Sequence, residues 1–306
     1  MTYLDLFSGI GGFSLGFQRA GWKFDKHYFS EINPYAIKIY QRHFPDAVPI
    51  GSITGIKPEE LGQVGLITFG FPCQDLSVAG SQSGFEGKRS VLFFEAIRLI
   101  QYLKPSIFIF ENVEGLFSSN EGKDFETVLR TIADLGVYDC EWQLVNTAWL
   151  LPQNRERVYF IGHLGGKSFP KVFPITSSGR EHIEKNKKAR KEVSQCLTTR
   201  GAKSRQGADY TWVRVAAVLT PNRKEKRQNG RQVKEFGEPS FTLTTQDRHG
   251  ITDGEEIREM TPIEWSRLQG FPDDWCDGVS DSQKYHALGN AVTVDVVEYI
   301  ARRLKA

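Results

Sequence analysis

Short apolar runs alternate with amphipathic stretches through residues 1 to 163, and this alternation restricts the fold more than any other feature of the chain. Short apolar runs are typical of buried strands, and strands that alternate with helices favour a parallel sheet covered on both faces. We therefore predict an α/β fold built on a doubly wound, mostly parallel sheet. Its expected strands are Tyr3–Phe7, Phe24–Phe29, Leu66–Phe69, Ile107–Phe110 and Val158–Ile161.

Several helix starts can be read from local signals. Asn33 followed by Pro34 is a cap and first-turn pair, which predicts a helix over Tyr35–His43. Thr261-Pro262-Ile263-Glu264 has the pattern of a capping box with proline at the first helical position. Further helices are expected at Val91–Tyr102, Phe125–Leu135 and Asn290–Leu304.

The sequence changes character after Gly162, where it becomes polar and rich in Gly and Lys, with short β-prone pieces at Thr211–Leu219 and Ser240–Thr245. Residues 164–250 carry 19 Lys and Arg against 8 Asp and Glu, a net charge of +11, whereas the rest of the chain carries 20 against 29, or −9. A basic segment within an acidic body indicates a polyanionic partner. A solvated loop is the alternative for this segment, and for residues 180–192 alone it is the better interpretation.

Composition excludes several classes of protein. Hydrophobic residues make up 40% and charged residues 25%, which is typical of a globular chain, and no run approaches the ~18 apolar residues of a membrane span. We expect a cytoplasmic protein. Its four cysteines, Cys73, Cys140, Cys196 and Cys276, form no CxxC pair, so neither a disulfide framework nor a metal site is indicated.

The first apolar run ends in a glycine-rich turn with the sequence DLFSGIGG, residues 5–12, and Glu31 follows at the end of the next expected strand. Glycines allow a ligand close to the backbone, and a carboxylate in this place accepts hydrogen bonds from ribose hydroxyls. The strict dinucleotide pattern fails because Ser14 occupies the third glycine position. A nucleoside cofactor without a pyrophosphate is therefore favoured, although a tight structural turn explains the glycines almost as well.

A second group of polar residues follows other expected strands. Cys73 comes after Leu66–Phe69 in a polar, glycine-spaced loop, whereas an inert cysteine is usually buried among apolar residues. Glu111 and Asn112 follow Ile107–Phe110, at the edge where open α/β sheets bind ligands, although a carboxylate there can simply cap a helix. Arg155 and Arg157 precede the last strand and should point the same way if the backbone is extended, with a pair of surface arginines as the alternative.

Taken together, these residues resemble the C5-cytosine DNA methyltransferase family. The match runs in family order through DLFSGIGGFSLG, SEIN, GFPCQDLSVAG, RSVLFFE, ENVEGL, QNRERVYFIG, REMTPIEWSRLQGFP and QKYHALGNAVTVDVV. The resemblance implies the S-adenosylmethionine-dependent methyltransferase fold for residues 1–164 plus 276–306. It also implies a smaller, irregular, β-rich target recognition domain over 165–275.

The resemblance also implies roles for individual residues. Cys73 would be the nucleophile that attacks cytosine, Glu111 would bind the cytosine ring, and Arg155 and Arg157 would be basic helpers. The implied ligands of S-adenosylmethionine, whose product is S-adenosylhomocysteine, are Phe7, Gly9, Gly11, Gly12, Glu31, Ile32, Ser52, Ile53, Pro72, Leu92, Asn290, Ala291 and Val292. The implied contacts to double-stranded DNA are Gln74, Ser77, Lys88, Arg89 and Arg248.

This interpretation describes a monomer that uses no metal and no membrane, with a separately acting restriction endonuclease as an open partner. One departure from the family pattern is Ser52, where an aspartate commonly accepts a hydrogen bond from the adenine amine. Two other functions remain open. A catalytically inactive DNA-binding relative would be excluded by methyl transfer, and a nicotinamide-dependent oxidoreductase leaves the basic segment and the ProCysGln sequence unexplained.

Overall fold

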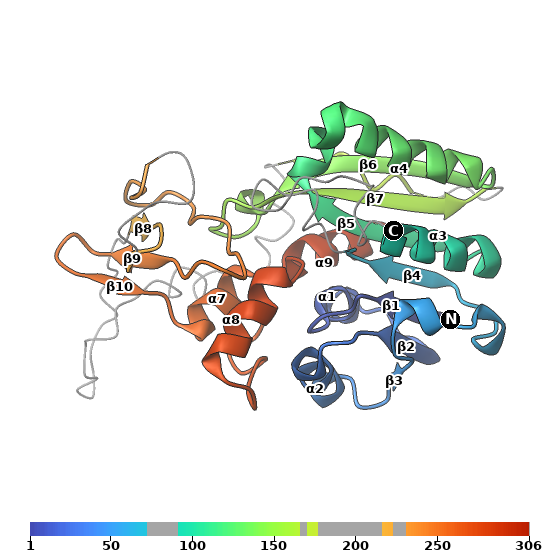
Figure 1. Cartoon of the computed structure of the whole chain (residues 1–306), viewed down its shortest axis with the longest axis horizontal. Helices are drawn as coiled ribbons and strands as arrows, with labels where there is room; N and C mark the ends of the chain where they lie inside the picture. The colour runs from blue at the N-terminus through green and yellow to red at the C-terminus, as the bar shows by residue number, and fades with distance from the viewer. Residues whose placement is uncertain (72–90, 166–169, 177–215, 223–230, 306) are drawn as a thin grey trace. The chain divides into compact units, whose positions relative to one another are not determined.

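The structure, a computed structural model, describes residues 1–71, 91–165, 170–176, 216–222 and 231–305 (Figure 1). The chain forms two compact units, of which unit 1 comprises Met1–Val145, Glu156–Ile175 and Val292–Ala306, and unit 2 comprises Asn146–Arg155 and Thr176–Ala291. The chain therefore passes between the units four times. The predicted domains, residues 1–164 plus 276–306 and residues 165–275, stay predictions, because a compact unit of the chain is not by itself a functional domain.

Unit 1 is built on a seven-stranded sheet in the order β3-β2-β1-β4-β5-β7-β6. The pairs β1–β2, β2–β3, β1–β4 and β4–β5 are parallel, whereas β5–β7 is antiparallel. The predicted doubly wound, mostly parallel α/β fold is thereby confirmed. The strands are β1 (Thr2–Leu6), β2 (Lys26–Ser30), β3 (Val48–Pro49), β4 (Leu66–Phe69), β5 (Ile107–Val113), β6 (Tyr138–Asn146) and β7 (Glu156–Leu164).

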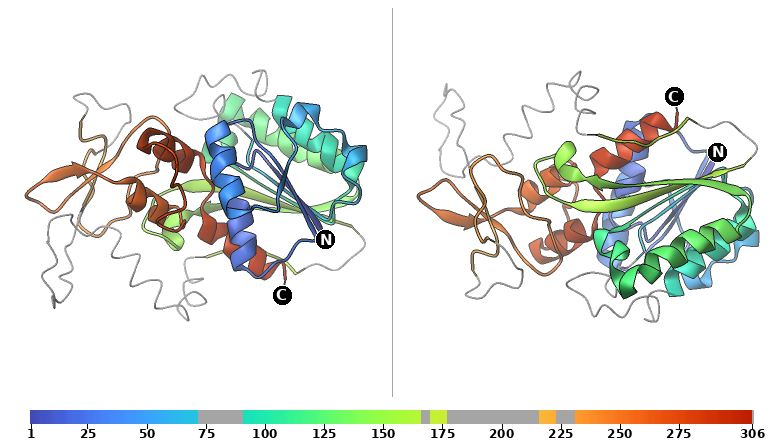
Figure 2. Two further views of the ribbon diagram at one scale, coloured as in Figure 1. Left: turned by 90° about the horizontal axis from the view of Figure 1, so that it is seen from below. Right: turned by 90° about the horizontal axis from the view of Figure 1, so that it is seen from above.

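Helices cover both faces of this sheet, with α3 and α4 on one face and α1 and α9 on the other (Figure 2). The helix α2 begins as predicted, because the Asn33 side chain accepts hydrogen bonds from the backbone N–H groups of Tyr35 and Ala36. The helix expected over Asn290–Leu304 is confirmed, but it begins later, at Val294, because Asn290 is the last residue of the preceding helix. The helices of unit 1 are α1 (Gly12–Arg19), α2 (Pro34–His43), α3 (Val91–Leu103), α4 (Lys123–Asp134) and α9 (Val294–Arg303).

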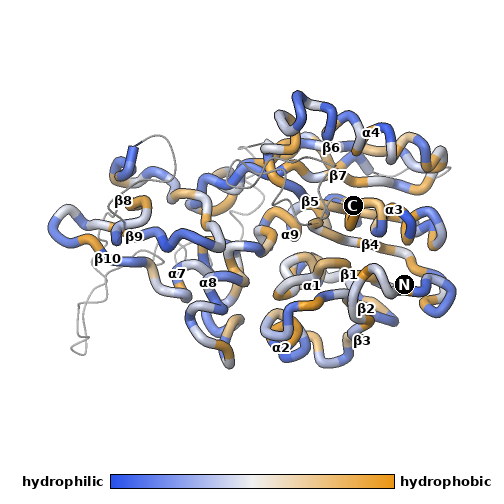
Figure 3. The backbone as a smooth tube through the Cα atoms, viewed as in Figure 1, coloured by the Kyte–Doolittle hydropathy of each residue, from blue (hydrophilic) through white to orange (hydrophobic). Residues whose placement is uncertain are grey.

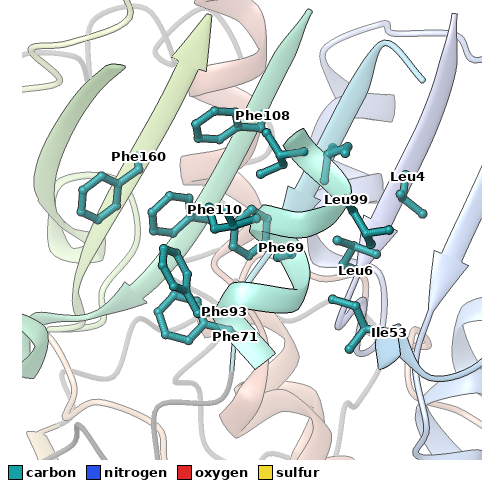
Figure 4. Packing of buried hydrophobic residues seen from close by; sticks show 14 of the residues in the cluster. Leu4, Leu6, Ile53, Phe69, Phe71, Phe93, Leu99, Phe108, Phe110 and Phe160 are labelled. Carbon is teal, nitrogen blue, oxygen red and sulfur yellow. The ribbon is translucent and has the colours of Figure 1, made fainter. Parts of the chain in front are cut away.

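An aromatic core lies between the sheet and the helices α3 and α4 (Figure 4). Phe110 stacks between Phe69 and Phe160, with ring centroids 4.8 Å and 4.4 Å away. Gly162 allows the ring of Phe108 to lie flat on β7, because a Cβ at this position would come within 2.1 Å of that ring. Such dense packing fixes β4 and β5, and the polar residues Glu111 and Asn112 lie in the last part of β5.

The helix α9 packs on α1 despite the long sequence separation between them. The contact is close because a Cβ at Gly16 would meet Val297 at 2.5 Å. The Trp22 indole donates a hydrogen bond to the carbonyl of Ala301 (2.9 Å), and Arg19 pairs with Asp295 (3.4 Å). The C-terminal residues of the chain therefore complete the layer around the first helix.

Among its described residues, unit 2 has a small antiparallel sheet and two helices. The sheet has the order β10-β9-β8, from β8 (Ala216–Val218), β9 (Gly250–Thr252) and β10 (Ile257–Glu259). The predicted capping box at Thr261 and Glu264 is confirmed at the start of α7 (Pro262–Leu268), and α8 (Asp281–Asn290) follows. Ser240–Thr245 forms only a single bridge, between Ser240 and Gln153, rather than the predicted strand.

Short 3₁₀ turns complete the described elements, at Ile53–Gly55, Pro58–Glu60, Glu114–Phe117, Ser119–Gly122 and Thr147–Trp149. Along α4, hydrophilic and hydrophobic segments alternate, as expected for a helix with one face on a sheet (Figure 3). Among the described helices, none combines the length and apolar character needed to span a bilayer.

Candidate active site

The glycine-rich turn lies at the carboxyl end of β1, where the order of strands in the sheet reverses between β1 and β4. Gly9 and Gly11 adopt left-handed conformations with φ of 53° and 87°, which glycine enters at low cost. A Cβ at Gly11 would lie 2.7 Å from the ring of Phe44, so this position also lacks room for a side chain. Gly12 begins α1 directly, and the turn therefore presents backbone N–H groups at a helix start.

Glu31 fastens this turn to the end of β2. One carboxylate oxygen accepts a hydrogen bond from the Gly9 amide (2.9 Å), and the other accepts from the amides of Ile32 (2.8 Å) and Asn33 (2.9 Å). Because each carboxylate oxygen has two lone pairs, Glu31 can still accept from a ligand hydroxyl. The role of Glu31 at a ribose stays a prediction.

Other predicted cofactor positions differ in their exposure. Ile32 leaves 76% of its surface exposed next to Glu31, which is unusual for a large apolar side chain and suits a ligand-facing position. Ile53 is only 3% exposed and packs in the core, so any ligand contact there would involve its backbone. Ser52 is exposed, and its hydroxyl lies 3.0 Å from that of Thr54. Phe7 is partly buried with φ of 50°, and Leu92 is partly buried near the start of α3.

A buried polar network below the turn was not predicted from the sequence. Asp5 is fully buried in β1 and accepts hydrogen bonds from Thr68 (2.8 Å), Ser14 (2.9 Å) and Tyr40 (3.0 Å). Burial raises the pKa of the Asp5 carboxyl to about 7, against the opposing effect of these hydroxyl donors. His27 lies 2.8 Å from the Tyr40 hydroxyl, and burial lowers the pKa of this imidazole to about 4. The only sign of this network in the sequence is a charged residue, Asp5, inside an apolar run.

Glu111 and Arg157 form an ion pair across two neighbouring strands of unit 1. The Arg157 Nε lies 2.9 Å from Glu111 Oε1, and both side chains are about six-sevenths buried, with exposures of 15% and 14%. Arg157 also donates from Nη1 to the carbonyl of Glu156 (2.7 Å). The ion pair fixes the Glu111 carboxylate near the end of β5. It uses Oε1, and the second oxygen, Oε2, takes no part in it.

That second oxygen lies beside the end of β4, because a Cβ at Gly70 would meet Glu111 Oε2 at 3.5 Å. Gly70 is followed in sequence by Phe71, which is described, and by six predicted site residues that are not. Pro72, Cys73, Gln74, Ser77, Lys88 and Arg89 lie outside the described residues, and their predicted roles stay predictions.

Arg155 has different surroundings from Arg157, contrary to the expectation that they point the same way. It precedes β7 and belongs to unit 2, where its side chain is buried. Its guanidinium donates to the backbone carbonyls of Leu243 (3.0 Å), Gly289 (3.3 Å) and Ala291 (2.9 Å). The alternation of strand side chains does not apply here, because regular pairing begins only at Glu156.

The remaining predicted residues lie at the end of α8 and beyond it. Asn290 is the last residue of α8, and Ala291 and Val292 occupy the connection to α9, with the boundary between the units falling between them. Arg248 lies in unit 2, with its guanidinium carbon 4.7 Å from the centre of the Tyr285 ring and Nη1 3.7 Å from Glu259. In the described parts of the chain, no three His, Cys, Asp or Glu side chains gather as metal ligands.

The fold of the chain is similar to that of solved methyltransferase structures. The crystal structure of the S. pombe Dnmt2 methyltransferase superposes with a TM-score of 0.68 at 21% identity, over 99% of this chain and 98% of that one. At this identity the likeness concerns the fold alone, and the sequence comparisons refine the class.

The model of the C-5 cytosine-specific DNA methylase family matches residues 1–306. The type II methyltransferase M.HpaII of Haemophilus parainfluenzae is 33% identical over 99% of this chain and 88% of its own length. The orphan methyltransferase M.SPBetaI of Bacillus phage SPbeta is 31% identical over 99% of this chain and 97% of its own length. The chain therefore belongs to the C-5 cytosine-specific DNA methylase family, which implies S-adenosylmethionine as the methyl donor and double-stranded DNA as the substrate.

Proposed function

We propose that this protein transfers a methyl group from S-adenosylmethionine to C5 of one cytosine within a specific double-stranded DNA sequence. The observation that carries the proposal is the Glu111–Arg157 pair, which directs a fixed carboxylate to the end of β4, beside Gly70. Cys73 follows Gly70 by three residues, and three residues span at most roughly 11 Å. The chain length therefore allows the thiol of Cys73 to reach Glu111.

The chemistry requires both groups. C5 of cytosine is too weak a nucleophile to attack a methyl sulfonium, so the sulfur of Cys73 first adds to C6 and makes the ring enamine-like. Glu111 binds the protonated ring nitrogen and the exocyclic amine, while Arg157 stabilises charge at the O2 oxygen. Once C5 carries the methyl group, a base removes the C5 proton, the bond between sulfur and C6 breaks, and the thiolate leaves.

The donor would lie on the glycine-rich turn of unit 1. The Gly9 and Gly11 backbone allows close approach, Glu31 is placed for the ribose hydroxyls, and the exposed Ile32 side chain offers an apolar contact for the adenine ring. S-adenosylhomocysteine would leave the same site after transfer. Bound there, S-adenosylmethionine supplies the electrophilic methyl group, and the residues of the turn orient it.

The substrate base must leave the duplex, because neither ring face is accessible in a stacked pair, and extrusion costs a few kcal/mol. The basic segment within residues 165–275 would act as the target recognition domain and contact phosphates and bases. Arg248 belongs to the part of this segment that the structure describes. Lys88 and Arg89 would add phosphate contacts. We expect a monomer in the cytoplasm of a bacterium or a phage-infected host, with any cognate endonuclease acting separately.

The experiment that tests this mechanism uses a DNA duplex whose target cytosine carries fluorine at C5. Sulfur attack and methyl transfer then proceed, but elimination stops because no proton can leave C5. A covalent complex that survives denaturation and needs S-adenosylmethionine should appear on a gel. It should be absent in Cys73→Ser and present in Cys140→Ser, Cys196→Ser and Cys276→Ser. An adduct that persists in Cys73→Ser would exclude the proposed nucleophile.

A further inference from the structure

Three buried side chains of unit 2 bind backbone groups at Leu243, at the end of α7 and around the end of α8. Arg155 donates to Leu243, Gly289 and Ala291, and Gln269 donates to Leu288 (2.9 Å) and Ala291 (3.4 Å). Gln153, which is fully buried, donates to Leu268 (2.9 Å) and accepts from the Leu243 amide (3.3 Å). We call Gln153, Arg155 and Gln269 the carbonyl clamp.

The carbonyls held by this clamp include those at the end of α8. The last four carbonyls of a helix have no partner within the helix, and they carry the negative end of its dipole. Arg155 brings a cation to this end, at Gly289, and Gln269 supplies a neutral donor at Leu288. The buried guanidinium of Arg155 satisfies a carbonyl at the helix end, and the negative end of the helix dipole compensates its charge.

The same end of α8 packs too closely to shift. A Cβ at Gly289 would lie 2.7 Å from the backbone carbon of Thr244, so the helix lies backbone to backbone against the segment that Arg155 also binds through Leu243. Asn290 and Ala291 continue directly from this contact. The clamp therefore determines where the backbone of residues 289–291 lies within unit 2.

Arg155 also links three places where the chain passes between the units. Its own carbonyl accepts a hydrogen bond from the Thr147 amide (2.8 Å), close to the Val145–Asn146 crossing. Arg155 itself directly precedes the crossing to Glu156, and its side chain holds Ala291, which directly precedes the crossing to Val292. Its guanidinium is surrounded by protein, because only 3% of the residue is exposed.

We propose that Arg155 is a positioning residue for the cofactor segment Asn290–Ala291 and does not contact the cytosine. This inference rests on the proposed function, in which that segment binds S-adenosylmethionine. Arg155 and Arg157 then divide two tasks between them. Arg157 orients the carboxylate that binds the base, whereas Arg155 fixes the end of α8, and loss of Arg155 weakens cofactor binding rather than the chemical step.

Two matched variants test whether Arg155 and Arg157 have these separate tasks. Arg155→Met and Arg157→Met each keep an unbranched apolar side chain, shorter than arginine by the guanidinium end, and remove its charge and donors. The dissociation constant for S-adenosylhomocysteine is measured by calorimetry, and kcat and KM for S-adenosylmethionine are measured on duplex DNA. Arg155→Met should weaken binding about tenfold, which corresponds to 1.4 kcal/mol, with kcat at saturating cofactor kept within about threefold. Arg157→Met should keep the dissociation constant and lower kcat at least about a hundredfold.

Gln269→Met provides an independent variant, since it removes a neutral donor from the carbonyls of Leu288 and Ala291 and should also weaken cofactor binding. If Arg155→Met does not fold, as judged by circular dichroism, Gln269→Met and Arg155→Lys carry the test. Unchanged cofactor binding in the folded clamp variants, or a fall in kcat that matches Arg157→Met, would overturn the proposal. If the unmodified protein binds S-adenosylhomocysteine but methylates no cytosine, the proposed function fails while the binding comparison still decides the role of Arg155.

Discussion

Glu111 and Arg157 are diagonal neighbours on one face of the antiparallel β5–β7 pair, and their side chains meet at 2.9 Å. Val113 lies opposite Arg157 and Tyr159 lies opposite Glu111, so each charged residue is two positions from the partner of the other. Long side chains reach across such a diagonal. The antiparallel strand β7 thus brings the cation of Arg157 to the carboxylate of Glu111, near the carboxyl end of β5. A parallel strand in this position would not bring the same residue to Glu111.

Replacement of Glu111 by Gln should slow methyl transfer at least about a hundredfold, because a neutral amide binds the protonated ring nitrogen less well and no longer pairs with Arg157. Single-turnover transfer on duplex DNA measures the effect. Glu114→Gln is the control, since it removes an exposed carboxylate three residues further on. Equal losses in the two variants would show that charge near the end of β5, rather than the Glu111 contact, matters.

Replacement of Ser52 by Asp should tighten binding of S-adenosylmethionine modestly, because a charged acceptor makes the stronger hydrogen bond to the adenine amine. Ser52 is exposed before the turn Ile53–Gly55, so the larger side chain needs no repacking. Calorimetry compares Asp with the neutral Ser52→Asn. Weaker or unchanged affinity in Ser52→Asp contradicts the assignment of this position to adenine.

Asp5 should make folding stability fall as pH rises. Its pKa is about 7 in the folded chain and 3.8 ordinarily, so between these values the folded chain holds a proton that the unfolded chain has released. In Asp5→Asn this proton is absent, and the slope of unfolding free energy against pH should become more positive, by up to about 1.4 kcal/mol per pH unit. Urea unfolding between pH 4 and 7 measures it.

His27 serves as the control for that experiment, because its effect has the opposite sign. Its folded pKa of about 4 lies below the ordinary 6.5, so the folded chain lacks a proton that the unfolded chain holds between these values. The stability it contributes is present above pH 6.5 and lost as pH falls to 4. His27→Asn should therefore make the slope more negative. Parallel curves for both variants and the unmodified chain would refute the assigned pKa shifts.

Gly289→Ala should destabilise the protein by about 1–3 kcal/mol, because the new methyl group would press on the Thr244 backbone, which cannot rotate away. Gly55→Ala is the matched control, since its Cβ would meet nothing within 4 Å. Thermal unfolding of both variants tests the contact. A midpoint for Gly289→Ala equal to that of Gly55→Ala would show that α8 can shift.

Exchange of residues 165–256 for the corresponding region of M.HpaII should change which sites are methylated, because base contacts determine specificity whereas phosphate contacts position the protein. Sequencing after a chemistry that distinguishes 5-methylcytosine identifies the modified sites. The unmodified chain and M.HpaII serve as the two references. If the exchanged protein keeps the specificity of the unmodified chain, the target recognition domain lies elsewhere.

The sequence predicted what depends on local pattern. The strand Leu66–Phe69 has the predicted bounds, and the caps at Asn33 and Thr261 form as expected, because a buried run and a capping side chain act over a few residues. The strand Tyr138–Asn146 was missed, since it shows neither an apolar run nor regular alternation, and its place at the sheet edge comes from pairing with distant residues.

Local pattern sets the same limit on what could be predicted of the active site. Glu111 could be placed at a strand end from the sequence, but no sequence pattern identified Arg157 as its ion-pair partner. Arg155 differs from Arg157 because the carbonyls of Leu243, Gly289 and Ala291 surround it, and no local pattern reports contacts so far along the chain. The network at Asp5 was hidden for the same reason.

The packing of α9 on α1 has a consequence for synthesis on the ribosome. Gly16 and Trp22 are made early, but Val297 and Ala301, which cover them, follow only after all of unit 2 has been translated. Until then α1 has an uncovered apolar face, and a growing chain in this state is open to chaperones and to aggregation. We expect that a messenger RNA cut upstream of Val294 yields no stable unit 1, so the nascent N-terminal half waits for the C-terminal helix before it can fold.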